Sequence, residues 1–286
     1  MAAGGEGLWG TARRGDCMME SMATLADVTA ALEDLAPLRL AAEWDAVGLL
    51  LGSRRPRVGR ILTCLTLTGP VAREAIDTGV DLVVSHHPLP FRPVGRITDA
   101  TPTGAILLDL AAAGIAVWSS HTAWDSAAGG INDQLAERCG LSAVAPLVAD
   151  PVAPRAGFGR MGLAGEGTTL AALATRLARS LSATGPLLVG DGRAPVGRVG
   201  IVCGSGADGI GKAHEAGCDT FLTGELKLHE ALHAAAIGMK VIAVGHHASE
   251  RFSMPVLGER LAARVAGVEC RSSVADVDPF TTLDGA

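Results

Sequence analysis

The segment Gly79-Val-Asp-Leu-Val-Val-Ser-His-His87 decides the fold class, because a glycine, a run of apolar residues and a pair of histidines follow one another directly. A glycine commonly ends a helix, and a short apolar run after it is typical of a buried strand. The second half of the chain contains a similar stretch, Gly217-Cys-Asp-Thr-Phe-Leu-Thr-Gly-Glu225. In each half the next apolar run leads to a histidine, His121 or His246, with a carboxylate four residues further on. We therefore expect two halves of similar plan.

Working outward from these stretches, short apolar runs alternate with helical patterns along most of the chain. The expected strands are 60–67, 81–85, 115–120, 199–203, 219–223 and 240–244. The expected helices are 24–35, 70–77, 103–113, 131–139, 170–181, 207–216, 226–237 and 249–266. Such alternation predicts an α/β fold, with two similar α/β halves and mostly parallel or mixed sheets.

Proline and glycine spacing suggests how the chain is divided. Residues 1–21 have no long apolar run and are expected to form a flexible N-terminal extension. The first α/β half is expected at 22–142 and the second at 196–286. Between them, 143–195 is rich in proline and glycine and is expected to be a connector with one helix, in which edge strands could also form.

Composition excludes several classes of protein. A net charge of −6 argues against a surface that binds duplex nucleic acid. No apolar stretch reaches about 18 residues without a charge, so no membrane span is predicted. The six cysteines are scattered without a C-x-x-C spacing, so we interpret them as reduced core residues and expect a cytoplasmic protein.

The strand ends carry the side chains that point to a metal. Ligands of open α/β sheets gather at the carboxyl ends of strands, where His86 and His87 stand, and neutral imidazole is a favoured ligand for zinc, iron, cobalt or manganese-like ions. Successive side chains of a strand point to opposite faces. The backbone must therefore turn near Pro88, or the two histidines serve two ions. The alternative is that the pair is merely polar or caps the next element.

A second group has helical spacing. Glu250 follows His246 by four residues, which places both on one helix face, although His247 fits that face too and spacing does not choose between them. His121 and Asp125 repeat the theme. Each carboxylate could instead cap a helix. Together these groups could hold one or two ions in a catalytic or exchangeable site. For Glu225 and Lys227 we prefer ordinary helix-start polarity.

Five motifs in order resemble those of one family. They are Trp44-Asp-Ala-Val-Gly-Leu49, the stretch from Asp81 to Pro88, His121 to Asp125 with Gly129-Gly-Ile-Asn-Asp133, Thr223-Gly-Glu225, and Gly245 to Arg251. Over residues 24–280 the chain resembles the Nif-three-like dinuclear metal centre family, the GTP cyclohydrolase 1 type 2 homologues.

The resemblance implies two divalent ions per chain, held in the cleft between the two halves, and a toroidal homohexamer. It implies five metal ligands, with Glu250 bridging the ions, and it selects His246 over His247: His86, His87, Asp125, His246 and Glu250. It makes His121 a neighbour of the site. The function expected from it is a metal-dependent hydrolase acting on a nucleotide-like substrate through a bridging hydroxide. The alternative is a non-catalytic, metal-handling, regulatory or scaffolding hexamer.

Overall fold

The computed structural model describes residues 23–281 and divides into two compact units. Unit 1 comprises 23–35, 46–121 and 254–277, and unit 2 comprises 36–45, 122–253 and 278–281. The chain therefore passes between the units several times. The expected extension, residues 1–21, lies outside the described residues.

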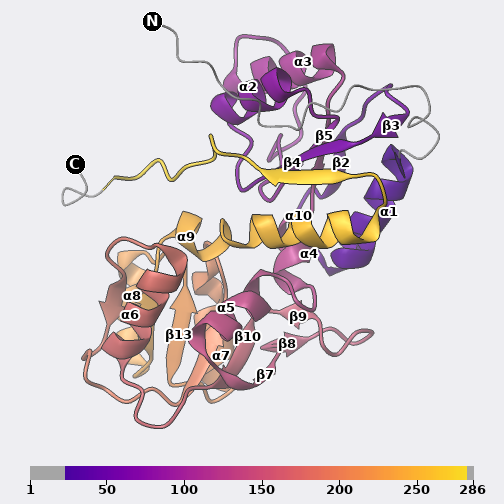
Figure 1. Cartoon of the computed structure of the whole chain (residues 1–286). Coiled ribbons are helices and arrows are strands. Elements are labelled where there is room, and N and C mark those ends of the chain that lie inside the picture. The colour runs from indigo at the N-terminus through magenta and orange to yellow at the C-terminus, as the bar shows by residue number, and fades with distance from the viewer. Residues whose placement is uncertain (1–22, 282–286) are drawn as a thin grey trace, which may run out of the picture. The chain divides into compact units, whose positions relative to one another are not determined.

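Unit 1 contains a five-stranded sheet in the order β15-β4-β5-β6-β2, of which only β2 is antiparallel to its neighbour (Figure 1). Its strands are β2 (Gly48–Leu51), β4 (Arg60–Cys64), β5 (Leu82–Ser85), β6 (Ala116–Ser119) and β15 (Glu269–Ser272). Its helices are α1 (Leu25–Leu35), α2 (Gly69–Thr78), α3 (Pro102–Ala113) and α10 (Ser253–Arg264). A small ladder pairs β1 (Ala23–Thr24) with β3 (Arg57–Val58).

Two helices of unit 1 begin and end by the same chemistry. The hydroxyl of Thr68 accepts from the backbone of the first turn of α2, and that of Thr101 does so for α3, each with a proline directly inside the helix. Both helices end at a glycine in the left-handed conformation. These helix ends therefore fix where the following strands, β5 and β6, begin.

The unit 1 sheet buries both faces. Leu62 and Cys64 of β4 belong to the core cluster that contains the apolar residues of α2 and α3. Thr63 points to the opposite face, where a Cβ on Gly258 of α10 would lie 3.2 Å from its methyl group. Because strand side chains alternate between faces, helices cover this sheet on both sides.

Unit 2 contains a mixed six-stranded sheet in the order β11-β14-β13-β12-β10-β7, in which β12, β13 and β14 run parallel. Its strands are β7 (Ser142–Ala145), β10 (Arg160–Leu163), β11 (Leu187–Val189), β12 (Arg198–Ile201), β13 (Thr220–Thr223) and β14 (Lys240–Ala243). Its longer helices are α5 (Ile131–Cys139), α6 (Leu170–Leu181), α7 (Gly209–Glu215) and α8 (Leu228–Ala236). Shorter elements are η2 (Leu38–Leu40), α4 (His121–Ser126), β8 (Val148–Ala149), β9 (Gly157–Phe158), η3 (Gly206–Asp208) and α9 (His246–Glu250).

The segment 143–195, expected to be a connector, contributes strands to the sheet of unit 2. Within it, β10 pairs with β12 on one side and β7 on the other, so it lies inside the sheet. At the two edges of the sheet, β11 pairs with β14 and β7 pairs with β10. Antiparallel pairing joins segments distant in the chain, which local glycine and proline content does not reveal.

The two sheets share a register that starts from an aspartate directly before a central strand. The Asp81 carboxylate accepts from the backbone of Gly59 (2.8 Å) and Arg60 (3.1 Å). Asp219 accepts from Gly197 (2.9 Å) and Arg198 (3.3 Å) in the same way. Ile61 pairs with Leu82 and Val199 with Thr220, so the offset between the strands is identical. The expected similarity of plan is confirmed at this level.

The described cysteines fit the expectation of reduced core residues. All are free thiols, and all but Cys270 are buried: Cys64, Cys139, Cys203, Cys218 and Cys270. Cys17 lies outside the described residues. Among residues 23–281, no helix is both long and apolar enough to cross a membrane.

Candidate metal centre

Three imidazoles gather at the strand ends of unit 1. His86 and His87 follow β5, and His121 follows β6 and opens α4. Each offers a ring nitrogen, and these nitrogens all lie within 4.8 Å of one another. The ring centroids of His86 and His121 are 5.1 Å apart, and those of His87 and His121 are 5.6 Å apart. A group of this kind could hold a metal ion.

The backbone turn anticipated near Pro88 explains how adjacent histidines join one group. The hydroxyl of Ser119 donates to the His86 carbonyl (2.5 Å), and that of Ser85 donates to the His87 carbonyl (2.8 Å). The hydroxyl of Thr66 lies 2.8 Å from Nδ1 of His87 and orients that ring. These contacts hold the backbone after β5, where side chains stop alternating between the two faces of the sheet.

His121 has an unusual backbone. Its φ is 24°, in a region that side chains other than glycine rarely adopt, and the residue is buried. Non-glycine residues persist in such conformations when the surroundings enforce them, commonly at functional sites. Directly after it, the Asp45 carboxylate accepts from the backbone of Thr122 (3.1 Å), which explains why the Trp44-Asp45 motif matters for the start of α4.

Unit 2 contributes an imidazole and a carboxylate on one helical turn. In α9, Nε2 of His246 lies 3.1 Å from Oε2 of the buried Glu250. The hydrogen bond to Glu250 raises the pKa of His246 to about 9, although burial opposes the rise. His247 faces elsewhere, with Nδ1 4.0 Å from Asp278. The structure thus pairs Glu250 with His246, the histidine that the resemblance selects.

Asp125 lies near the same group. Burial, together with the charges of Asp125 and Glu250, raises the pKa of the Cys203 thiol well above its usual range. Asp125 also hydrogen-bonds to this thiol, which places Asp125 beside Cys203, two residues after the end of β12.

The next residue makes room for those donors. Gly204 has φ +58°, and a Cβ there would clash with Oε1 of Glu250 and lie 3.2 Å from Nε2 of His246. The chain is therefore shaped around this imidazole–carboxylate pair. The donor chemistry and the space both fit a divalent first-row ion.

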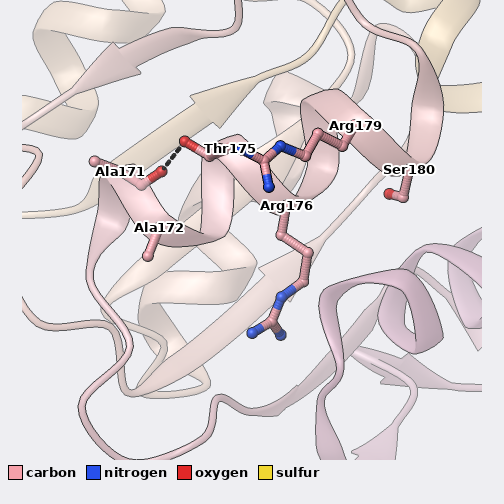
Figure 2. A pocket seen from close by; sticks show the side chains of 6 residues that line it. All are labelled: Ala171, Ala172, Thr175, Arg176, Arg179 and Ser180. Atoms are coloured by element: carbon pink, nitrogen blue, oxygen red, sulfur yellow. Dashed lines mark hydrogen bonds between the residues drawn. The ribbon is translucent and has the colours of Figure 1, made fainter.

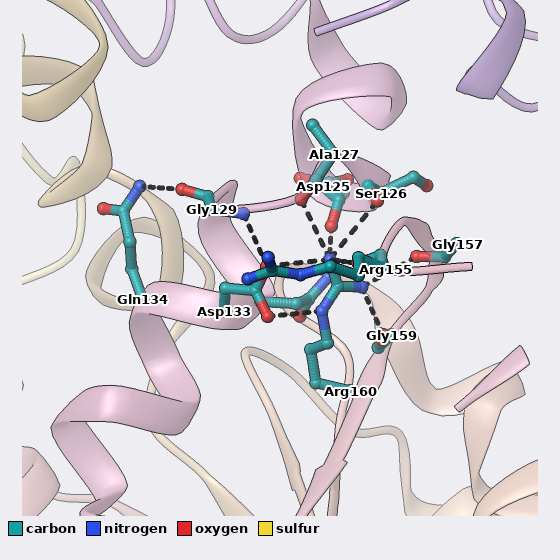
Figure 3. Close-up of polar contacts among 11 residues, drawn as sticks. Asp125, Ser126, Ala127, Gly129, Asp133, Gln134, Arg155, Gly157, Gly159 and Arg160 are labelled. Carbon is teal, nitrogen blue, oxygen red and sulfur yellow. Dashed lines mark hydrogen bonds and ion pairs between the residues drawn. The ribbon is translucent and has the colours of Figure 1, made fainter. Parts of the chain in front are cut away.

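A buried arginine holds the loop that follows Asp125 (Figure 3). Arg160 of β10 is fully buried, and its guanidinium donates to both carboxylate oxygens of Asp133, at 2.5 and 2.9 Å. It also donates to the carbonyls of Ala127 (2.9 Å), Gly157 (2.9 Å) and Gly159 (2.7 Å). Asp133 in turn accepts from the backbone of Gly129 (2.6 Å).

Asn132 ties Asp125 to the end of β12. Its amide donates to the Asp125 carbonyl (3.1 Å), and its side-chain oxygen accepts from the backbone of Cys203 (2.9 Å). The Gly129-Gly-Ile-Asn-Asp133 motif therefore braces the chain around Asp125. Asn132 and Asp133 were visible in the sequence as part of a motif, but no sequence signal marked Arg160 as their partner.

A shallow surface hollow of about 700 Å³ lies over α6 (Figure 2). It is lined by residues of that one helix: Ala171, Ala172, Thr175, Arg176, Arg179 and Ser180. The hollow shares no residue with the groups described above, so it is separate from the candidate centre at the strand ends.

Comparison with known proteins shows to which family the chain belongs. The family model described as Duf34/NIF3 (NGG1p interacting factor 3) matches residues 23–279. The chain belongs to this family. A relative from Clostridium perfringens, named GTP cyclohydrolase 1 type 2 homolog, is 33% identical over 90% of this chain and 98% of its own length. The NIF3-like protein 1 of Drosophila melanogaster is 32% identical over 91% of this chain and 89% of its own.

Solved structures of the family share the fold. The crystal structure of a Bacillus cereus protein related to NIF3 matches 92% of this chain and all of that chain with a TM-score of 0.85, at 22% identity. The predicted α/β fold class and the family resemblance are confirmed. The histidine group of unit 1 is compatible with metal binding in a member of this family.

Proposed function

We propose that this chain is a metal-dependent hydrolase that binds two divalent ions. The proposed ligands are His86, His87, Asp125, His246 and Glu250. One observation carries the proposal: both sheets end their central strands in imidazole and carboxylate donors, and the chain belongs to a family whose relatives are named GTP cyclohydrolase 1 type 2 homologues.

The chemistry follows from the donors. Two divalent ions held by these residues would lower the pKa of a bound water and would stabilise negative charge that develops on the substrate. The chain's part is to hold the donors: Thr66 orients His87, Gly204 leaves room for Glu250, and Asn132 braces the backbone of Asp125. The substrate class, a nucleotide-like molecule, rests on the name of the relatives.

The first test is metal content. Elemental analysis of protein purified without added metal should find about two zinc, iron, manganese or cobalt ions per chain. His86→Ala and Glu250→Ala should each lower this number, whereas the exposed His229→Ala should not. Metal content near zero in every wild-type preparation would refute the proposal.

The second test is turnover. A screen of nucleotides for hydrolysis should find activity in the wild-type protein that His86→Ala and Glu250→Ala abolish and His229→Ala retains. Hydrolysis that survives in both ligand variants would assign the activity to other residues.

The family description itself names a protein interaction, which favours a second candidate, a metal-containing regulatory or scaffolding assembly. We propose a homohexamer for either function, on the resemblance alone. Light scattering after size-exclusion chromatography should give six times the mass of the chain. A hexamer that binds metal but hydrolyses no nucleotide would favour the second candidate.

A further inference from the structure

Glu225 stands where the repeated register puts a proposed ligand in the other unit. His86 and His87 follow Asp81 by five and six residues, and Gly224 and Glu225 follow Asp219 by the same numbers. The backbone of both Gly224 and Glu225 donates to the Gly204 carbonyl, at 3.0 Å each. Glu225 is therefore the unit 2 counterpart of His87, and its backbone is held against the end of β12.

The Glu225 side chain faces the outer edge of a proposed ligand. Its Oε1 lies 3.5 Å from Nδ1 of His246, and the Ser205 hydroxyl donates to the same carboxylate oxygen. Ser205 Oγ also lies 3.5 Å from Nδ1 of His246. This contact differs from the helix-start role that the sequence alone favours for Glu225.

The other nitrogen of the same ring faces Glu250. Nε2 of His246 lies 3.1 Å from Glu250 Oε2, so the imidazole stands between two carboxylates. Glu250 is a proposed metal ligand and Glu225 is on the opposite edge. An ion bound beside Glu250 would take the lone pair of Nε2, which requires the remaining ring proton to be on Nδ1, facing Glu225.

We propose that Glu225 is a positioning residue that accepts the Nδ1 proton of His246 and fixes the ring so that Nε2 is the metal donor. Metal-bound histidines commonly donate their second N–H to a carboxylate, which sets the tautomer and the ring orientation. Ser205 holds the carboxylate in place. The inference rests on the proposed metal site and adds to it a residue that does not itself bind the ion.

The experiment compares Glu225→Ala and Glu225→Gln with wild type, and Glu215→Ala serves as a control for an exposed glutamate of the same unit. Calorimetric titration of metal-free protein with Zn²⁺ measures the affinity. We expect Glu225→Ala to weaken binding at one of two sites by about 10–100-fold. Glu225→Gln should weaken it less, because the amide oxygen still accepts the N–H, and Glu215→Ala should match wild type.

Two further measurements separate positioning from other roles. Because the Glu225 side chain is half exposed, the unfolding temperature of metal-free Glu225→Ala should equal that of wild type. X-ray absorption of the zinc-loaded variant at saturating metal should show an unchanged number of zinc ligands. A lower unfolding temperature without an affinity change, or a lost oxygen ligand, would overturn the positioning role.

The outcomes also distinguish the two proposals. Equal zinc affinity in Glu225→Ala and wild type would overturn the inference and leave the metal site intact. Wild-type protein that binds no zinc would overturn the metal site, and the role of Glu225 with it.

Discussion

At the scale of single residues, the candidate centre requires a glycine beside the proposed metal ligands as well as the ligands themselves. Gly204 is buried beside the His246–Glu250 pair and has a positive φ, so no side chain fits there without moving a proposed ligand. Burial, together with the charges of Asp125 and Glu250, raises the pKa of the neighbouring Cys203 thiol.

Gly204→Ala should therefore impair metal binding more than folding. The added methyl group would displace the Glu250 carboxylate, and the left-handed backbone would cost about 1–2 kcal/mol of stability. We expect the zinc affinity to fall at least tenfold in a calorimetric titration. Gly211→Ala is the matched control, because a methyl group there meets nothing within 4 Å. Unchanged affinity in Gly204→Ala would show that Glu250 is not held in its observed position.

At the scale of elements, Arg160 joins β10 to the turn between α4 and α5. Arg160 is fully buried, whereas its partner Asp133 keeps 27% of its side chain exposed. Removing the guanidinium leaves a partly buried carboxylate and several buried carbonyls without their donor, which is more costly than losing a surface pair.

Arg160→Met should lower the free energy of unfolding by about 3–5 kcal/mol, as measured by urea denaturation. Arg193→Met is the control, because Arg193 pairs with Asp191 at the surface with 92% of its side chain exposed. The control should change stability little. If the two variants lose equal stability, the buried network is not a major support of unit 2.

Asp219 belongs to the same scale, because it links the starts of β12 and β13. Burial alone would raise its pKa, but hydrogen bonds from Thr220, Gly197 and Lys240 hold the pKa below its usual value. A lowered pKa in the folded state means that the ionised carboxylate stabilises the fold above the unfolded-state pKa of about 3.9. This contribution is lost as the pH falls through the lower folded-state value.

Asp219→Asn should therefore destabilise the protein at pH 7, and the difference from wild type should shrink progressively below about pH 4. Urea denaturation at pH 7 and at the lowest pH where wild type stays folded measures it. The exposed Asp77→Asn should show little difference at either pH. A difference for Asp219→Asn that does not depend on pH would mean that the carboxylate charge is not the stabilising feature.

At the scale of the whole molecule, the proposed ligands come from both compact units. Any ion that binds only the folded chain stabilises it by mass action, by about 2.7 kcal/mol at a hundredfold excess over its Kd. Zinc should therefore raise the unfolding temperature of metal-free wild-type protein. His86→Ala combined with Glu250→Ala should abolish the rise, and His229→Ala should retain it. An equal rise in the double variant would place zinc binding elsewhere.

Much of the architecture was predictable because the signals are local. The apolar runs that start at Asp81 and Asp219 form β5 and β13 within a residue of the expected bounds. Threonine, proline and glycine mark the ends of α2 and α3. Spacing of four residues placed His246 and Glu250 on one helical turn, which the structure shows.

What local patterns do not contain is the pairing of distant segments. The strand β15 joins β4 of the first sheet, and β10 enters the second sheet from a stretch that reads as a connector. Arg160 contacts Asp133 because β10 enters the sheet of unit 2. Glu225 contacts His246 because β13 and β14, which they follow, are neighbours in that sheet. Element type follows from apolar periodicity and from the backbone preferences of neighbouring residues, whereas partners follow from how the chain packs as a whole. The kinds of donor could therefore be read from the amino-acid order, and the residues that position them emerged only from the folded chain.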